Sequence, residues 1–229
     1  MTDFRALPGR FDFYFLRHGE SEGNSARLMQ GRGDYPLSKA GREQAHRVAG
    51  WFAGRRIGRL LSSPLARAHE TARILADSLG LAEVELCEEL NELDTGLFTG
   101  LTVEQIRTRH PEAWRSFQRE SWEGVPGAER IASLRERAER LWELLAGSAV
   151  ADQAVLGVTH SGILQWVLKA TLGCRTWMPV VPMGNCSISR FSVDNRREGE
   201  PAGYYAEWSL INHQPLGESR QDGHLFLKT

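Results

Sequence analysis

Hydrophobic residues form short dense runs that alternate with apolar positions at helical spacing along most of the chain. Residues 11–16 are an aromatic and apolar run bounded by Gly9 and Gly19, which predicts a strand buried on both faces. From Ser38, which is suited to an N-cap, apolar positions recur at helical spacing up to Gly54. This part of the chain is therefore predicted to form a strand, a loop and an amphipathic helix.

The same order of strand, turn and helix returns directly afterwards. Residues 57–61 are a second apolar run and predict a second strand. Ser63 and Pro64 then predict an N-cap followed by proline at the first helical position, and Gly80 predicts the end of that helix. We expect this helix to begin at Ser63.

A third unit of this kind lies late in the chain. Residues 154–158 predict a strand, and the sequence THSG turns it into a helix over residues 163–172, with Ser161 as its N-cap and Gly173 at its end. Weaker patterns predict the other elements. They are an edge strand at 84–86, a helix opened by a capping box at Thr102 and Gln105, an amphipathic helix over 131–145, and strands over 187–193 and 204–211.

Alternating strands and helices predict an α/β fold with a mainly parallel sheet covered on both faces. Ligands of such sheets bind beyond the carboxyl ends of the strands. We expect one domain spanning residues 1–229, with the segment at about 99–127 forming a helical lid or insert. Trp114 and Trp122 in this insert predict either a stacking surface for a substrate ring or simple packing of the insert.

Charge and cysteine content narrow the function classes. The net charge of 229 residues is −1, and no run of five or six like charges occurs, so we expect no nucleic-acid or membrane partner. No apolar stretch approaches the ~18 residues of a membrane span. The three cysteines are scattered and odd in number, which favours a reducing, cytoplasmic location.

Cationic and imidazole side chains follow the predicted strands. Arg17 and His18 come directly after the first strand, His160 follows a later one, and Arg67 lies early in the helix after the second. A neutral imidazole can attack phosphorus, while two guanidiniums and a second imidazole balance charge on the transferred oxygens. Taken singly, Arg67 is more often an exposed helix arginine and His160 more often a capping residue, and only their coincidence with Arg17 and His18 favours a site.

An acidic segment supplies a proton donor for such a reaction. Glu89, Glu92 and Asp94 lie within six residues of one another, and a carboxyl with a raised pKa could protonate a leaving alkoxide and then activate water. Spacing alone leaves open which of the three does so, and an ordinary acidic loop is the alternative.

Five ordered motifs make the chain resemble the phosphoglycerate-mutase-like branch of the histidine phosphatase superfamily. They are LRHGESEGN, MQGRGDYPLSKAGREQA, SSPLARAHETA, ELNELDTGLFTGLT and VTHSG, with a weaker echo in PVVPMGNCSISRF. The resemblance implies a three-layer α/β/α sandwich with a mixed, mostly parallel central sheet. It also implies a phosphoric monoester hydrolase that needs no metal and no cofactor.

Residue roles follow from the resemblance motif by motif. It implies that His18 becomes phosphorylated, that Arg17, Arg67 and His160 hold the phosphoryl oxygens, and that Glu92 is the general acid and base. Further implied substrate- or phosphate-binding residues are Asn24, Gln30, Gly31 and Ser161. The usual Gly-Glu-Ser motif of the family is replaced by Ala128-Glu129-Arg130, which puts a role for Glu129 in doubt.

Three functions remain open at this stage. The chain lacks the RHGxRxP form of the acid-phosphatase and phytase branch, and it lacks the long basic insert of cofactor-dependent mutases. We therefore expect a phosphomonoesterase acting on a small phosphorylated metabolite, ahead of a phosphoglycerate mutase and of a non-catalytic phosphate-binding regulatory protein. The natural substrate is not readable from the sequence, and the oligomeric state stays open, a homodimer included.

Overall fold

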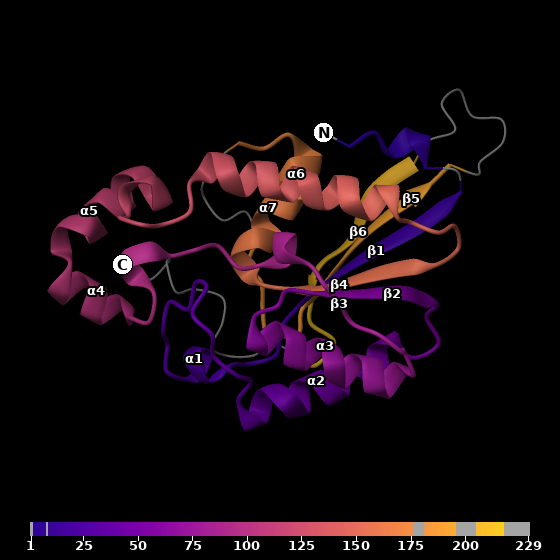
Figure 1. The fold of residues 1–229 in the computed structure, drawn as a ribbon, viewed down its shortest axis with the longest axis horizontal. Coiled ribbons are helices and arrows are strands. Elements are labelled where there is room, and N and C mark those ends of the chain that lie inside the picture. Colours follow the sequence, from indigo (N-terminus) through magenta and orange to yellow (C-terminus); the bar gives the residue numbers. More distant parts are fainter. Residues whose placement is uncertain (1, 8, 176–180, 196–204, 218–229) are drawn as a thin grey trace.

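The computed structural model describes residues 2–7, 9–175, 181–195 and 205–217 (Figure 1). Its strands are β1 (Arg10–Arg17), β2 (Ile57–Ser62), β3 (Glu85–Leu86), β4 (Ala154–Thr159), β5 (Ile188–Asp194) and β6 (Tyr205–His213). Its α-helices are α1 (Glu22–Ser25), α2 (Lys39–Phe52), α3 (Ala66–Leu79), α4 (Val103–Arg109), α5 (Pro111–Glu120), α6 (Ile131–Gly147) and α7 (Ser161–Leu172). Short 3-10 turns are η1 (Phe4–Ala6), η2 (Glu88–Leu90), η3 (Gly96–Phe98) and η4 (Ser121–Gly124).

The strands form one mixed sheet in the order β3-β2-β4-β1-β5-β6. The pairs β1–β4, β2–β4 and β2–β3 are parallel, whereas β5 runs antiparallel to both β1 and β6. Because β1, β2 and β4 are parallel, their carboxyl ends lie at the same edge of the sheet. The sheet of the predicted α/β class is thereby confirmed, with its antiparallel strands gathered at one side.

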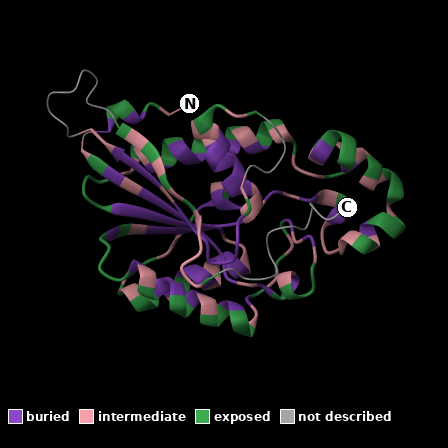
Figure 2. Ribbon diagram, turned by 180° about the vertical axis from the view of Figure 1, so that it is seen from behind, coloured by how far each residue is buried: buried purple, intermediate pink, exposed green. Residues whose placement is uncertain are grey.

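Helices cover both faces of the sheet, α6 and α7 on one and α2 and α3 on the other (Figure 1). The central strand β4 is buried along its whole length, and β1 is buried from Phe13 to its end (Figure 2). Successive residues of β1 divide between the two cores: Phe13 and Phe15 pack with α6 and α7, while Tyr14 and Leu16 pack with α2 and α3. A strand with two buried faces needs apolar residues on both sides, and residues 13–16 supply them without interruption.

Two helix starts differ from the sequence prediction. The third helix begins at Ala66, not at Ser63, and its first amide donates to Asp34 Oδ1 at 2.7 Å. The last helix begins at Ser161 itself, so the predicted N-cap residue is the first helical residue and makes no cap. In both places a carboxylate from another segment binds the free amides, and no local rule reveals such a partner.

The segment at 99–127 is helical, as predicted, and contains α4, α5 and η4. Its two tryptophans, Trp114 and Trp122, pack against Phe98 and Phe117 in a separate aromatic cluster. Of the two interpretations of these side chains, the structure therefore supports packing of the insert.

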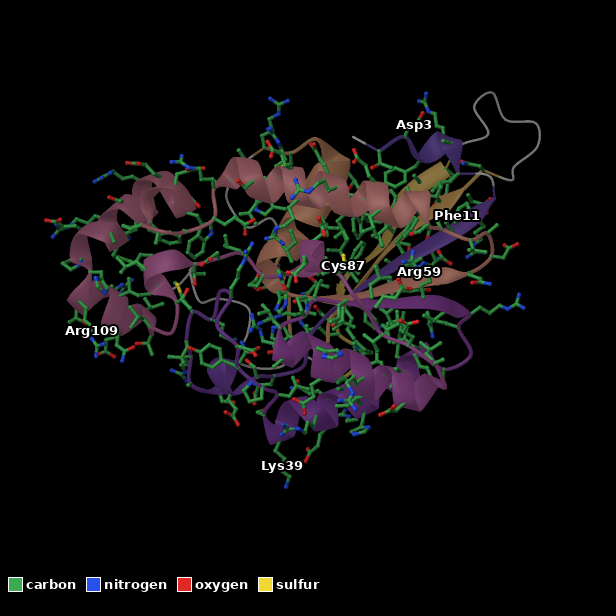
Figure 3. All side chains as sticks on the ribbon, in the orientation of Figure 1. Asp3, Phe11, Lys39, Arg59, Cys87 and Arg109 are labelled. Atoms are coloured by element: carbon green, nitrogen blue, oxygen red, sulfur yellow. The ribbon has the colours of Figure 1, made fainter. Side chains whose placement is uncertain are left out.

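The three cysteines form no disulfide in the part of the chain that the structure describes. Cys87, Cys174 and Cys186 are free thiols, and Cys87 lies in the interior whereas Lys39 projects outward from the start of α2 (Figure 3). Among the residues that the structure describes, every helix is too short or too polar to traverse a lipid bilayer.

Candidate active site

Two histidines meet at the carboxyl ends of β1 and β4. The parallel register pairs Arg17 with Thr159, and the His18 amide donates to the Thr159 carbonyl at 3.0 Å. The next residue after each strand is therefore a histidine at the same edge of the sheet. The ring centroids of His18 and His160 are 5.0 Å apart.

One nitrogen of the His18 ring makes a hydrogen bond that fixes the orientation and the tautomer of the ring. Its Nδ1 lies 2.6 Å from the Gly19 carbonyl oxygen, and because a carbonyl only accepts, Nδ1 carries the proton. Nε2 of the neutral ring then keeps its lone pair. Burial, followed by the charges of Arg67 and Arg17, lowers the pKa of His18 well below 6.5, so the ring is neutral at neutral pH.

Both arginines of the site are buried and anchored by backbone carbonyls. Arg17 donates through Nη1 to Met183, and Arg67 donates to the carbonyls of Gly33 and Gly31, each at 2.8 Å. Burial lowers the pKa of Arg67 to about 10, which leaves it charged at neutral pH. The Nε of Arg67 has no hydrogen-bond partner within the described part of the chain.

Of the three acidic candidates, Glu92 is the one beside the histidines. Its carboxylate accepts the amides of Gly162 at 3.2 Å and Ile163 at 3.1 Å, at the start of α7. Glu89 instead pairs with Arg140 at 3.6 Å, and Asp94 binds the Gly96 amide at 2.9 Å.

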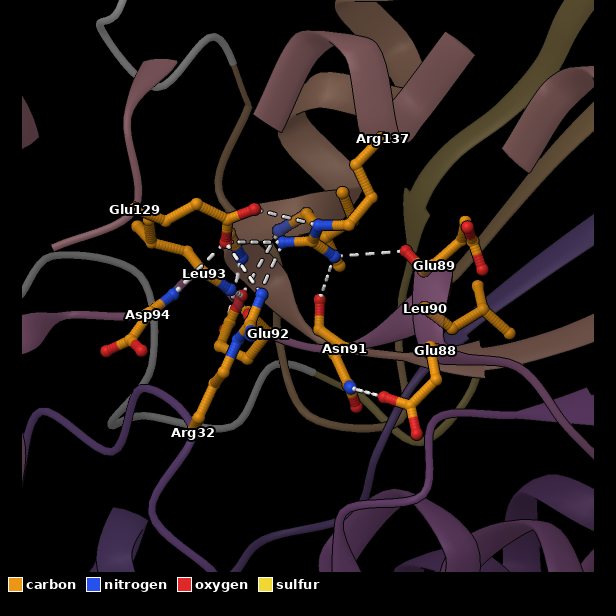
Figure 4. Close-up of polar contacts among 12 residues, drawn as sticks. Arg32, Glu88, Glu89, Leu90, Asn91, Glu92, Leu93, Asp94, Glu129 and Arg137 are labelled. Carbon is orange, nitrogen blue, oxygen red and sulfur yellow. Dashed lines mark hydrogen bonds and ion pairs between the residues drawn. The ribbon is translucent and has the colours of Figure 1, made fainter. Parts of the chain in front are cut away.

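A buried arginine of α6 fixes the loop that carries Glu92 (Figure 4). Arg137 donates Nε and Nη2 to the two carboxylate oxygens of Glu129 at 2.9 and 2.8 Å. Its Nη1 and Nη2 also bind backbone carbonyls at Glu89, Asn91 and Glu92. Glu129 therefore has a structural role despite its altered motif, and it also reaches Arg32 at 3.3 Å.

The remaining predicted contacts lie around Ser21. The Ser21 hydroxyl oxygen lies 2.9 Å from Oδ1 of Asn24 and 2.7 Å from Oε1 of Gln30, and its single proton can go to one of them. Gly31 contributes its carbonyl to Arg67. The Ser161 hydroxyl faces Glu92 at 3.5 Å. Gly31 and Ser161 therefore contact catalytic candidates, whereas Asn24 and Gln30 contact Ser21. Contact of any of these four residues with a substrate stays a prediction.

The arrangement of the histidine, cysteine and acidic side chains bears on whether the site could hold a metal ion. Among the described residues, no group of three or more histidine, cysteine, aspartate or glutamate side chains is arranged to hold a metal ion. The positive charge at the strand ends comes from Arg17 and Arg67.

Similarity to known proteins agrees with this geometry. The family model of the histidine phosphatase superfamily (branch 1) matches residues 13–200. The chain belongs to the histidine phosphatase superfamily. The probable phosphoglycerate mutase GpmB of Yersinia pestis is 34% identical over 184 residues, which are 77% of this chain and 82% of that protein.

Solved structures of histidine-phosphatase-like folds superpose over nearly the whole chain. A mycobacterial glucosyl-3-phosphoglycerate phosphatase in complex with VO3 is 29% identical, with a TM-score of 0.75 over 89% of this chain and 99% of the other. A phosphoserine phosphatase variant from Entamoeba histolytica, bound to phosphoserine, is 25% identical, with a TM-score of 0.72 over 88% and 96% of the two chains. The three-layer fold expected of the superfamily is thereby confirmed.

Several polar residues of this histidine phosphatase site escaped the sequence analysis. Asn91 binds Ser63, Arg137 binds the acidic loop, and the Asn185 amide donates to the His18 carbonyl at 3.0 Å. One signal was present for Arg137, since it falls within the apolar stripe of its helix next to Ala138. Asn185 comes from a distant loop, and its only signal was its place in the weaker motif PVVPMGNCSISRF, which gave it no role.

Proposed function

We propose that the protein is a metal-independent phosphomonoesterase that works through a phosphohistidine at His18. The observation that supports this most is the neutral His18 ring, whose Nδ1 is bound to Gly19 while two guanidiniums, those of Arg17 and Arg67, act on it electrostatically. A nucleophile with a free lone pair and a dianion site made of fixed cations are what in-line phosphoryl transfer requires.

The first step forms the phosphoenzyme. Nε2 of His18 attacks phosphorus, the bond from phosphorus to the ester oxygen breaks, and the carboxyl of Glu92 gives that oxygen its proton. Arg17 and Arg67 stabilise the charge on the three equatorial oxygens. The Gly19 carbonyl, bound to Nδ1–H, stabilises the positive charge that the ring gains.

The second step returns the enzyme to its starting state. Glu92, now a carboxylate, takes a proton from a water molecule whose oxygen attacks phosphorus. The bond between Nε2 and phosphorus breaks, and inorganic phosphate leaves. Glu92 and Arg67 interact electrostatically, which supports a carboxyl group within reach of the phosphoryl group.

A phosphoglycerate mutase is the second candidate, because the 34% identical relative carries that name. A mutase must keep its phosphoenzyme away from water until the bound intermediate is rephosphorylated. A third candidate, a phosphate-binding regulatory protein, would share the site but lack turnover. The natural substrate, a small phosphorylated metabolite, is part of the proposal only as a class.

One assay separates the three candidates. The protein is incubated with an aryl phosphate, and separately with 3-phosphoglycerate plus its bisphosphate, and both phosphate release and isomerisation are followed. Release of phosphate supports the esterase, whereas isomerisation without release supports the mutase. Silence in both assays contradicts either enzyme.

A further inference from the structure

A chain of hydrogen bonds leads from the molecular surface to the second histidine of the site. The exposed Glu88 accepts from Asn91 Nδ2, and the contact is drawn in Figure 4. The Ser63 hydroxyl donates to Asn91 Oδ1 at 2.8 Å. The same hydroxyl lies 2.9 Å from Nε2 of His160. Three segments far apart in the sequence are thus joined in one line.

The donor and acceptor of each hydrogen bond in this chain follow from Glu88, the residue at its outer end. A carboxylate only accepts, so Asn91 turns its amide nitrogen to Glu88 and its oxygen to Ser63. The single hydroxyl proton of Ser63 goes to that oxygen. Its lone pairs are left to accept, one from the Leu65 amide at 3.2 Å and one from His160. Nε2 of His160 is therefore the protonated nitrogen.

The other nitrogen of the same ring has no such partner. Nδ1 of His160 is fully buried and makes no hydrogen bond with the residues that the structure describes. In the neutral ring this atom presents a lone pair. A lone pair repels a phosphoryl oxygen, whereas a protonated Nδ1 would donate to it.

We propose that Glu88, Asn91 and Ser63 are positioning residues that fix neutral His160 as its Nε2–H tautomer, so that a bound phosphoryl group gains a hydrogen bond from Nδ1 only when the ring takes up one proton. The proton comes from water or from a monoanionic phosphate ester, and His160 returns it when phosphate leaves. This inference rests on the proposed phosphoryl site.

The charges around His160 decide when that proton is bound. Arg67, Arg17 and Arg137 act on the ring by their positive charge, and together with burial and the His18 ring they hold its pKa well below 6.5. The carboxylate of Glu92 lies near His160, since it accepts the amides of Gly162 and Ile163 at the start of the helix that follows His160. A dianion between the arginines offsets their charge and so raises the proton affinity of the ring.

The tautomer is measured by ¹⁵N NMR on protein labelled at histidine, without ligand, with His160 assigned by the His160→Gln variant. We expect the pattern of a protonated Nε2 and an unprotonated Nδ1. Glu88→Lys reverses the chain, because an ammonium only donates: Asn91 turns its oxygen outward, Ser63 then donates to Nε2, and the proton moves to Nδ1. Glu89→Lys, with the same charge change one residue along, keeps the original pattern.

Proton uptake is measured by calorimetric titration with sulfate in buffers of different ionisation enthalpy, since sulfate stays a dianion at neutral pH. We expect about one proton taken up per sulfate by the unmodified protein and by Glu89→Lys, and close to none by Glu88→Lys. An Nδ1–H tautomer in the unmodified protein, or sulfate binding without proton uptake, overturns the inference. If sulfate does not bind and an aryl phosphate is not turned over, the result counts against the proposed function. The inference about His160 is then still decided by the tautomer, because the tautomer is measured without ligand.

Discussion

The imidazole rings of His18 and His160 lie with their centroids 5.0 Å apart and their planes inclined by 58°. Both rings are buried, and burial followed by the charge of Arg67 lowers the pKa of each. Two neutral imidazoles consequently lie beside two charged guanidiniums. The site attracts an anion through its arginines while the His18 ring stays neutral, with the lone pair on Nε2 that a nucleophile needs.

Acid should destabilise the fold through these two rings. Their pKa is lower in the folded state than the 6.5 of an ordinary histidine, so the unfolded chain binds more protons below pH 6.5. Their contribution to the free energy of unfolding is therefore complete above pH 6.5 and falls with decreasing pH, by up to about 1.4 kcal/mol per pH unit for each ring. Urea unfolding between pH 8 and 5 measures this slope.

Two variants test the source of that slope. His160→Gln should make the slope shallower, whereas His46→Gln, on the exposed side of α2, controls for the loss of a histidine. A slope that is the same in both variants would contradict a buried neutral ring at position 160.

Removal of the nucleophile should end turnover. His18→Ala leaves the arginines in place but no nitrogen to accept phosphorus, so we expect kcat to fall by more than about 10³-fold and acid-labile protein-bound phosphate to disappear. Quenched incorporation of ³²P measures the intermediate, with His46→Ala as control. Substantial residual activity in His18→Ala would point to a different nucleophile.

Replacement of the proton donor should depend on the leaving group. In Glu92→Gln we expect hydrolysis of alkyl phosphates to slow by about 10²–10⁴-fold, because an alkoxide leaves only with a proton. Nitrophenyl phosphate, whose leaving group is a weak base, should slow far less. Glu89→Gln is the matched control, since Glu89 pairs with Arg140. Equal losses for both substrates would place proton donation on another residue.

Loss of the buried arginine should destabilise the loop that carries Glu92. Arg137→Met leaves the Glu129 carboxylate and three carbonyls without their donor, and we expect about 3–5 kcal/mol less stability. The same change at Arg140, which is exposed and forms an ion pair with Glu89, should cost less than about 1 kcal/mol. Urea unfolding compares the two, and similar values would remove the case for an anchoring role.

Chelation should leave the reaction unchanged. Arg17 and Arg67 already supply fixed positive charge for the phosphoryl oxygens, so activity after exhaustive dialysis against EDTA should equal that before it. Added Mg²⁺ or Zn²⁺ serves as the comparison. A strict requirement for a divalent cation would argue against the proposed chemistry.

Most strands and helices could be predicted from local sequence, because the spacing of apolar residues and the capping residues differ between strands and helices. The dense run at 11–16 allows only a strand with two buried faces, and the capping box at Thr102 and Gln105 opens α4 as predicted. Gly80 ends α3 in the left-handed conformation at φ 66°, which glycine adopts at little cost. The identities of His18, Arg67 and Glu92 were likewise available from ordered motifs.

The first residue of a helix was harder to predict from the sequence, and the reason is physical. Ser63 is suited to an N-cap, but in the fold its hydroxyl donates to Asn91, and Asp34 binds the first amide of the helix. Free amides take whichever acceptor the tertiary structure brings closest, and a local rule counts only acceptors a few residues away.

Sequence patterns alone were enough to place two histidines and one arginine next to predicted strands, with Arg67 early in a helix, and the ordered motifs already pointed to Glu92. The folded molecule was needed to show how the Glu92 carboxylate is held, which nitrogen of each ring holds a proton, and that Arg137 anchors the acidic loop. Periodicity and turn chemistry act over a few residues, whereas hydrogen-bond direction and burial depend on partners that the chain brings together only when it folds.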